Sequence, residues 1–435
     1  MGFTGNGLLG AMVTAGNETA DDIGTLRIEI GRTDILDDRM PGTEYAVGNG
    51  GRCDRVRLPI GYFQLRTAGK VTRGSMRLSL AHATLKGNLT TSRGTISFSI
   101  FTHALRDLNV AHLTTSAGES AAEWLWNPRP GSSVWAQQCD RIDKDKKYTP
   151  NPPQVNGTKV HGSSSVPYTV QPLFSGASFA TAYSSRVEMD GSRTLLASTA
   201  QPMTGARGGG DGTDSAMTAV SNVELGQALG YSALRRSHRR WWAKYYKQSF
   251  LTMTDSRTEA FYWAQLYKLA SATHETDVAP TYGVYDHTGP WFTPSDTCCP
   301  LFNWDMNFPV QYQIIFGSNH PEIGRGMAKL LSDPIVRLDL AANAGWISTN
   351  STPSNPISDA ISMQRWMFRR CWFLKHHSEY VDNAIGFDRR EFTLEESSSS
   401  SPIDLSRFDN NAVVPVALAK PARNPRRPID IAFSN

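Results

Sequence analysis

Short runs of apolar residues, separated by turns that contain glycine and asparagine, fill the first half of the chain, and helical periodicity is nearly absent there. Runs that alternate with turn signals in this way are typical of an antiparallel sandwich rather than of a parallel α/β sheet. We therefore predict an N-terminal antiparallel β-sandwich over residues 1–220. Its strands include residues 25–30, 75–80, 94–101 and 107–114.

Two segments interrupt this pattern. Residues 126–165 are rich in Pro, Lys and Ser, which indicates a long excursion between strands before the pattern resumes at 168–182. Residues 205–212 (GARGGGDG) resemble a phosphate-binding loop only in their glycines, because the GK[ST] ending is missing. We interpret this second segment as a flexible link.

Helical patterning begins near Asn222. Within 232–247, seven Lys, Arg or His residues surround four aromatic residues that form one apolar stripe at i, i+1, i+4 and i+5. We predict a helical linker over 221–252, whose basic residues are solvated or face acidic groups. The alternative, a nucleic-acid-binding helix, predicts retention on a heparin column at physiological salt. The residues of the stripe are Trp241, Trp242, Tyr245 and Tyr246.

A second helical pattern follows the linker. Ser256 and Glu259 have the spacing of a capping box, in which the hydroxyl and the carboxylate satisfy free N–H groups of the first turn. The helix behind them is apolar nearly all round, so we expect it to be buried among other helices. A third start is predicted at Asn319, with Pro321 in the first turn and Glu322 three residues on.

The alternation of helix, long loop and helix in the second half of the chain predicts a partial (α/α)6 barrel over residues 253–395. Residues 363–375 add one more candidate helix to it. Residues 396–435 are rich in Ser, Pro and Arg and cannot bury enough apolar surface to order themselves, so we expect a disordered tail.

Composition narrows the class of protein. The 435 residues are 40% hydrophobic and 19% charged, and no apolar run approaches the roughly 18 residues of a membrane span, so we expect a soluble protein without membrane contact. The 44 Lys and Arg against 40 Asp and Glu leave +4, too small a charge to imply a nucleic-acid partner. The 11 Trp and 14 Tyr suit sugar binding, because a pyranose stacks on an aromatic ring, although core packing accounts for most of them.

Cysteine and sequon usage adds little to this picture. Cys298 and Cys299 are adjacent and not spaced for zinc, and we predict no metal and no cofactor. The first residues (MGFTGNGLLGAMV) lack the features of a signal peptide. Either the protein is cytosolic, or the chain begins inside a longer precursor, for which we expect a secreted or extracellular product. N-x-S/T sequons, which permit glycosylation in a secretory context, stand at Asn17, Asn88, Asn156 and Asn350.

Residues 282–322 hold more carboxylates, amides and aromatic rings than a core needs. The carboxylates of Asp286 and Asp305 are candidates for catalysis, although capping a helix or holding an Arg is the commoner use. Asn303 and Asn307 do not titrate, but their amides can fix a water or a sugar hydroxyl, with loop capping as the alternative.

The remaining candidates in this stretch are rings. Trp291 follows Gly-Pro and can stack on a sugar, and core packing is the equal competitor. Trp304 stands between Asn303 and Asp305, and we assign it, like Trp291, to substrate binding. His320 is the third candidate, although a lone His in the first turn of a helix is more often structural.

Three segments of the predicted sandwich resemble the N-terminal β-domain of the glycoside hydrolase family 95 group. They are GNGLLGAMV at 5–13, IGRTDILDDR at 30–39 and RLPIGYFQL at 57–65. Three further segments look like the opening of the catalytic (α/α)6 barrel of that group, which belongs to the six-hairpin glycosidase superfamily. They are WAQLYKLASAT at 263–273, DHTGPW at 286–291 and NWDMN at 303–307.

The resemblance covers roughly residues 2–335 and implies inverting hydrolysis of terminal α-L-fucosides, or of galactosides in some members of the family. It also implies that Asn303 and Asn307 belong to an asparagine motif that holds and polarises the attacking water, beside a general-base Asp. The family pattern is N-x-N and then M-N-[YF]. This chain departs from it, because the first Asn falls on Leu301, or Asn303 pairs with Asp305 after a two-residue slip.

A second departure concerns the general acid and base. In the family they lie on later barrel hairpins, well beyond the asparagine motif, and this chain does not visibly contain them. The strand that normally precedes GNGxxGA is also expected to be missing. We therefore expect a chain truncated at both ends. The alternative to a glycosidase is a catalytically incomplete carbohydrate-binding or vestigial fragment.

Overall fold

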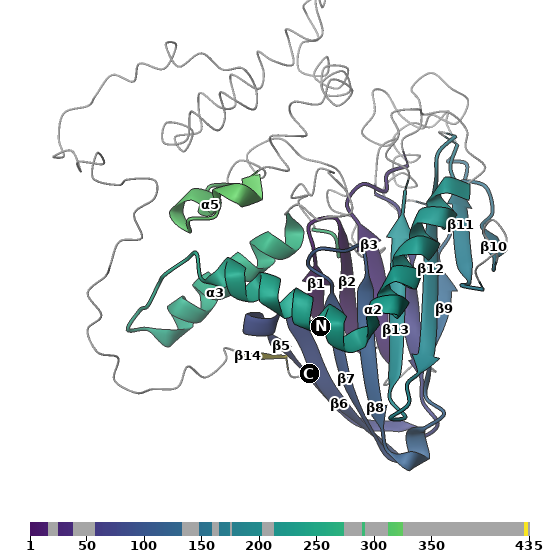
Figure 1. Cartoon of the computed structure of the whole chain (residues 1–435), viewed down its shortest axis with the longest axis horizontal. Helices are drawn as coiled ribbons and strands as arrows, with labels where there is room; N and C mark the ends of the chain where they lie inside the picture. The colour runs from purple at the N-terminus through teal and green to yellow at the C-terminus, as the bar shows by residue number, and fades with distance from the viewer. Residues whose placement is uncertain are drawn as a thin grey trace, which may run out of the picture.

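Two antiparallel sheets packed face to face make up most of the structure (Figure 1). The first sheet has five strands, in the order β1 (Gly2–Gly5), β2 (Leu9–Ala15), β3 (Leu26–Arg32), β4 (Gly61–Arg66) and β9 (Glu123–Pro128). The second sheet has nine strands, in the order β10 (Val155–Gly157), β11 (Tyr168–Pro172), β12 (Ser178–Val187), β13 (Arg193–Ala200), β8 (Asn109–Thr115), β7 (Thr95–Thr102), β6 (Thr84–Thr91), β5 (Val71–Ser79) and β14 (Asp430–Phe433). The computed structural model describes residues 1–15, 25–37, 57–132, 148–158, 165–174, 176–201, 213–273, 289–291, 312–324 and 430–433.

Alternate residues of the strands point into the core between the sheets. In β7, Ile96, Phe98 and Ile100 are buried, whereas Thr95 and Ser97 are exposed. A period of two is the one expected for strands with a single face in a core. The predicted sandwich is confirmed, and helices follow it. Strand ends differ from the sequence prediction by a few residues.

The loop between β1 and β2 is a tightly bonded turn. Asn6 is fully buried, and its Oδ1 accepts the backbone N–H groups of Leu8 (3.2 Å) and Leu9 (2.8 Å). Its Nδ2 donates to the carbonyl oxygens of His103 and Arg106 in the loop between β7 and β8. The expectation that no strand precedes the GNG segment is wrong, because β1 pairs with β2 directly before this turn.

Helix α2 (Thr213–Tyr246) lies across β12 and β13 (Figure 1). It begins before Asn222, the start that the sequence predicted, because its first turns are built from small residues with little hydrophobic signal. Ala219, Val220 and Val223 of this part are buried against the outer face of the second sheet. At Gly230 the backbone is not helical (φ 72°, ψ 158°), a conformation that glycine adopts without steric cost, and α2 is kinked there.

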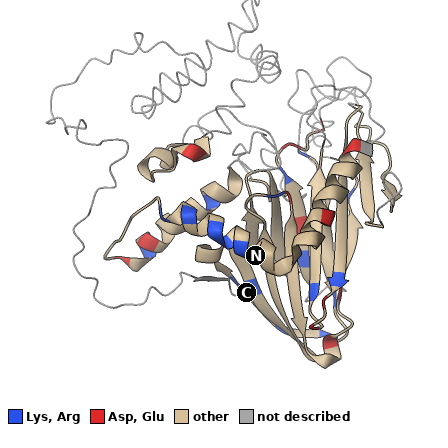
Figure 2. Cartoon of the chain, in the orientation of Figure 1, with Lys and Arg blue, Asp and Glu red and all other residues tan. Residues whose placement is uncertain are grey.

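The part of α2 after the kink carries the aromatic stripe and most of the basic residues. Trp242 and Tyr245 are buried, and Trp241 and Tyr246 pack against the same core, which confirms the predicted stripe. Lysines and arginines gather on this part of α2, whereas the part before the kink carries acidic residues (Figure 2).

His238 is the exception among the basic residues of α2, because it is buried rather than solvated. Its Nδ1 accepts the backbone N–H of Ala104 at 3.2 Å, and its Nε2 donates to the carbonyl oxygens of His82 and Ala83 at 3.1 Å each. A neutral imidazole satisfies all of these bonds. Burial, helped by the nearby His103, lowers the pKa of His238 to about 3.

His103, in the loop between β7 and β8, forms the second half of this contact between helix and sheet. Its Nδ1 accepts the N–H of Leu105 at 3.2 Å, and its Nε2 lies 2.9 Å from the hydroxyl of Ser237. Burial, and then the charge of Arg106, lower the pKa of His103 to about 4. Two neutral histidines therefore hold α2 on the sandwich.

Helix α3 (Ser256–Ala272) begins at a different cap from the predicted one. Asp255, not Ser256, is the N-cap residue, and its side chain accepts the backbone N–H of Arg257 at 3.1 Å. A carboxylate at this position also favours the positive end of the helix dipole. Glu259 accepts the backbone N–H of Met253, two residues before this cap, so the predicted capping box of Ser256 and Glu259 is wrong.

Only the second half of α3 is buried. Leu266 and Tyr267 are inaccessible, whereas Phe261 is 65% exposed and Tyr262 and Trp263 are partly exposed. The expectation that α3 is buried on all sides is therefore wrong for its first half, since no neighbouring element among the described residues covers it.

Two short elements, α5 (Ile314–Gly317) and the 3-10 turn η4 (Pro321–Gly324), are what the structure describes of the predicted barrel beyond α3. The predicted helix at 363–375 lies outside the described residues. Residues 430–433 form β14 beside β5, although we expected disorder from 396 onward; β5 would otherwise present an unpaired edge. The predicted domain boundaries stay predictions. None of the described helices has a segment long and apolar enough to cross a membrane.

Candidate functional site

Residues 289–291 fix the beginning of the predicted site on the sandwich. Trp291 is 8% exposed, and its ring lies on Phe3 of β1 with centroids 4.1 Å apart. Gly289 has φ +71°, and a Cβ there would lie 2.5 Å from the indole of Trp291. Only glycine permits this turn, in which the ring folds back over the backbone.

Segments that carry the family resemblance supply the contacts to these residues. Arg57, of the segment RLPIGYFQL, donates from Nη1 to the carbonyl oxygen of Gly289 at 2.5 Å. Gly10, of the segment GNGLLGAMV, lies so close to Pro290 that a Cβ would come within 2.9 Å of it. These two segments therefore hold the chain at the start of the candidate site.

Residues 312–324 fix the end of the predicted site on the helices. Tyr312 is fully buried, and its hydroxyl lies 2.8 Å from the hydroxyl of Thr273 at the end of α3. His320 is also fully buried, and its ring stacks on Tyr245 of α2 with centroids 3.9 Å apart. Trp291 and Tyr312 belong to the same hydrophobic core cluster, so the residues on either side of 292–311 pack in one core.

His320 lies in a hydrogen-bonded row with a serine and a carboxylate. Its Nε2 is 2.9 Å from Oγ of Ser249, and its Nδ1 is 2.9 Å from Oε1 of Glu322. This order resembles a nucleophilic triad. However, the Ser249 hydroxyl is buried and donates to the carbonyl oxygen of Ser318 at 2.5 Å. Because its proton is committed to this carbonyl, Oγ does not donate to Nε2, and the row connects η4 with the segment that follows α2 rather than offering a nucleophile.

Of the predicted site residues, the structure describes Trp291 and His320. Trp291 lies in the core just before residues 292–311, and His320 lies in the packed segment after them. Their predicted contact with a sugar stays a prediction. In the structure, both side chains are buried. The other predicted site residues lie outside the described residues, and they are Asn303, Asp305, Asn307, Asp286 and Trp304.

Each strongly buried carboxylate in the described ranges has polar partners of its own. Each is bound to a cation, an amide or backbone N–H groups, which gives it a structural role in this part of the chain. The partners are Arg32 for Asp107 (2.8 Å), Arg129 for Glu29 (3.1 Å), Asn151 for Asp37 (2.7 Å), and the N–H groups of Ala68 and Gly69 for Glu119 (2.8 Å each). In the same ranges, no three His, Cys, Asp or Glu side chains lie close enough together to hold a metal.

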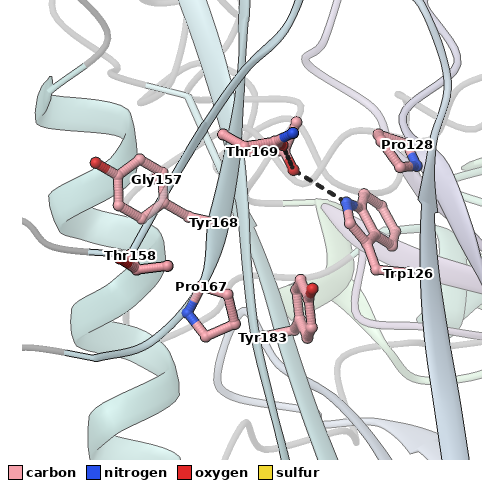
Figure 3. A pocket seen from close by; sticks show the side chains of 9 residues that line it. Trp126, Pro128, Gly157, Thr158, Pro167, Tyr168, Thr169 and Tyr183 are labelled. Atoms are coloured by element: carbon pink, nitrogen blue, oxygen red, sulfur yellow. Dashed lines mark hydrogen bonds between the residues drawn. The ribbon is translucent and has the colours of Figure 1, made fainter.

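The sequence did not predict a pocket of about 370 Å³ at one edge of the sandwich (Figure 3). It lies between β9 of the first sheet and β10, β11 and β12 of the second. A signal was present in the chain, because Trp126 and Tyr168, which line the pocket, flank the Pro-rich excursion of 126–165.

No protein-family model matches this sequence, and no curated protein is significantly similar to it. Among solved structures, a protein from the human microbiome named as a kojibiose phosphorylase is similar, with a TM-score of 0.49 and 10% sequence identity over 79% of this chain. A bacterial glucoamylase solved with acarbose has a TM-score of 0.41 and 11% identity over 88% of this chain. The chain spans 45% of the length of the first protein and 66% of the length of the second.

Proposed function

We propose that this chain belongs to a carbohydrate-active protein that hydrolyses a terminal α-glycoside with inversion, with an α-L-fucoside as the first candidate. One observation carries the proposal. The segment that holds Asn303, Asp305 and Asn307, residues 292–311, is flanked on both sides by residues of one core, Trp291 and Tyr312. Catalytic groups must be positioned to within a fraction of an ångström, and a segment whose two ends are packed in the core favours such positioning.

The roles follow from what each side chain can do. The amides of Asn303 and Asn307 hold the attacking water, and Asp305 is the adjacent carboxylate that polarises it. Asp286 and Trp304 contact the sugar. Trp291 and His320 take the part of anchors in the proposal, since both are buried. An inverting reaction needs a second carboxyl group about 6.5–9.5 Å from the first, and the family places it on a later hairpin.

The test is a panel of aryl α-L-fucosides, α-D-galactosides and α-D-glucosides offered to the full-length gene product. We expect release of the aglycone from at least one of them, with the β-anomer as the first product in the proton NMR spectrum. Asn303→Ala should lower kcat about 10²-fold, since it removes one preorganised hydrogen bond to the reacting water.

Asn88→Ala is the matched control, because it removes an exposed amide of β6. It should leave kcat unchanged. A panel left uncut by the full-length protein, or equal rates for Asn303→Ala and the control, would contradict the proposal.

A second candidate is a carbohydrate-binding protein without turnover. The observation that favours it is the commitment of each strongly buried carboxylate in the described ranges to a structural partner. Binding on a glycan array without release of any product from the same glycans would select this candidate over the hydrolase.

A further inference from the structure

We propose that the pocket at the edge of the sandwich binds a neutral saccharide. The inference goes beyond the proposed hydrolysis, because the pocket is built from strands and not from residues 282–322. In Figure 1 the strands β10 and β11 lie on the opposite side of the structure from α3 and α5. Three properties of the pocket favour such a ligand, which are its rings, its polar atoms and its lack of charge.

The rings of Trp126 and Tyr183 form a rigid apolar wall. Both pack on Phe63, which is fully buried, with ring centroids 4.7 Å and 5.4 Å from it. Trp126 and Tyr183 lie 6.1 Å apart and tilted by 41°. Both are only partly buried, and the third ring of the pocket, Tyr168, extends away from them over Gly157 (Figure 3). Aromatic rings that pack on the core through one side and are accessible on the other can stack on the apolar face of a pyranose.

The polar atoms of the pocket are linked in a short chain. The Trp126 indole N–H donates to Oγ1 of Thr169 at 3.2 Å (Figure 3). That hydroxyl in turn donates to Oδ1 of Asn156 at 2.8 Å. Asn156 is exposed, and its Nδ2 makes no hydrogen bond within the described part of the chain. An amide fixed through its oxygen therefore presents two N–H donors at the mouth of the pocket.

Tyr183 adds a second polar group. Its hydroxyl also makes no hydrogen bond among the described residues. Burial raises the pKa of Tyr183, so the group stays a neutral hydroxyl that can both donate and accept. An apolar wall with a small number of placed hydrogen-bonding groups is the usual arrangement of small-molecule sites.

Size and charge narrow the ligand. A volume of about 370 Å³ is at the small end of ligand pockets, which range over ~300–1,000 Å³. None of the nine lining residues is Asp, Glu, Lys, Arg or His. A charged ligand would lose its hydration here without gaining an opposite charge. A neutral sugar unit has no charge to desolvate, and its hydroxyl groups can form hydrogen bonds with the Asn156 amide and the Tyr183 hydroxyl.

The experiment is saturation-transfer NMR with methyl α-L-fucopyranoside, methyl α-D-glucopyranoside and maltotriose, each titrated into the full chain. Protein from a bacterial host keeps Asn156 free of glycan, since Asn156, Gly157 and Thr158 form a sequon. We expect binding of at least one probe. Trp126→Ala should weaken it about three- to tenfold, the range that one aromatic contact contributes.

Two further variants keep the test valid if Trp126→Ala fails to fold. Asn156→Ala truncates an exposed side chain, and Tyr183→Phe retains the ring. Each should weaken binding about two- to tenfold through a lost hydrogen bond. Trp263→Ala is the matched control, since it removes a partly exposed indole of α3, and it should bind as the wild type does.

Two results would overturn the inference. One is a wild-type protein that binds none of the three probes. The other is binding that Asn156→Ala and Tyr183→Phe leave at the wild-type strength, which would place the saccharide elsewhere on the chain.

Discussion

The junction between α2 and α3 and the pocket at the sandwich edge are both rich in aromatic rings, yet they differ in what surrounds the rings. At the junction, Trp242 and Tyr245 are buried, and the Tyr245 hydroxyl donates to the carbonyl oxygen of Leu266 at 3.0 Å. At the pocket, Trp126 and Tyr183 are partly exposed, and the Tyr183 hydroxyl has no partner among the described residues. Aromatic content is the same signal in both places. The spare polar groups of the junction, the Trp242 indole N–H and the Tyr246 hydroxyl, are buried, whereas the rings and polar groups of the pocket have an open face.

The difference has a physical cause. A ring surrounded on all sides has already gained the free energy of leaving water, and nothing remains for a ligand to add. A ring that packs on Phe63 through one side remains accessible to water on the other. A ligand that covers the accessible side removes it from water and so gains hydrophobic free energy. The accessibility of the rings and polar groups, rather than the number of rings, separates a core from a binding site.

The largest expected effect is on the junction. Trp242→Ala removes a fully buried ring that packs against Tyr245 and Tyr267 and should lower the free energy of unfolding by about 3–5 kcal/mol. Denaturant unfolding followed by circular dichroism measures it. Phe250→Ala is the control, because Phe250 is 84% exposed and its loss should change stability by less than about 0.5 kcal/mol. Similar losses for both variants would remove the distinction between buried and open rings.

A smaller effect is expected from acid at the contact between α2 and the sandwich. The folded-state pKa values of His238 (about 3) and His103 (about 4) lie below the usual value of about 6.5 for an unfolded chain. Between these values the unfolded state binds more protons than the folded state. The stabilisation is therefore complete above pH 6.5 and decreases as the pH falls. At pH 5 the loss is on the order of 2 kcal/mol for each histidine.

Stability measured from pH 7 to pH 5 tests this expectation when the wild type is compared with His238→Gln, which cannot gain a proton. The difference between the two curves should narrow by on the order of 2 kcal/mol at the acidic end. Parallel curves would mean that His238 is charged, or solvated, in the folded protein.

The smallest expected effect on stability is at the pocket. Asn156→Ala should change the free energy of unfolding by no more than about 0.5 kcal/mol, because the side chain is exposed and Thr169 can bond to water in its place. Thermal unfolding of the two proteins in parallel measures the change. A loss of several kcal/mol would assign Asn156 to the fold rather than to a ligand.

The sandwich could be predicted from the sequence because a strand with one buried face leaves a period of two, as Ile96, Phe98 and Ile100 show. The aromatic stripe of α2 was predictable for the same reason, with a helical period. The burial of His238 was not, since a histidine in a basic run gives no sign of which partners the sheet supplies. The N-cap of α3 was predicted one residue too late. Asp255 and Ser256 are adjacent and both suit an N-cap, and only the backbone geometry decides which of them takes that position.

The pocket was beyond prediction for a further reason. Trp126, Thr169 and Tyr183 come from strands of two different sheets, and no local pattern states that these edges meet. For the catalytic candidates, the sequence places Asn303, Asp305 and Asn307 in one segment, and the structure adds the anchors on either side of it.

The most direct measurement is a fluorine NMR titration of protein labelled with 5-fluorotryptophan. The chain has 11 Trp, and single Trp→Phe variants assign the signals of Trp126 and Trp242. On addition of methyl α-L-fucopyranoside, methyl α-D-glucopyranoside or maltotriose, we expect the Trp126 signal to move with saccharide concentration while the Trp242 signal stays in place. A Trp126 signal that is unaffected by all three saccharides, or a Trp242 signal that moves with it to the same extent, would contradict the distinction between an open saccharide pocket and a closed aromatic core.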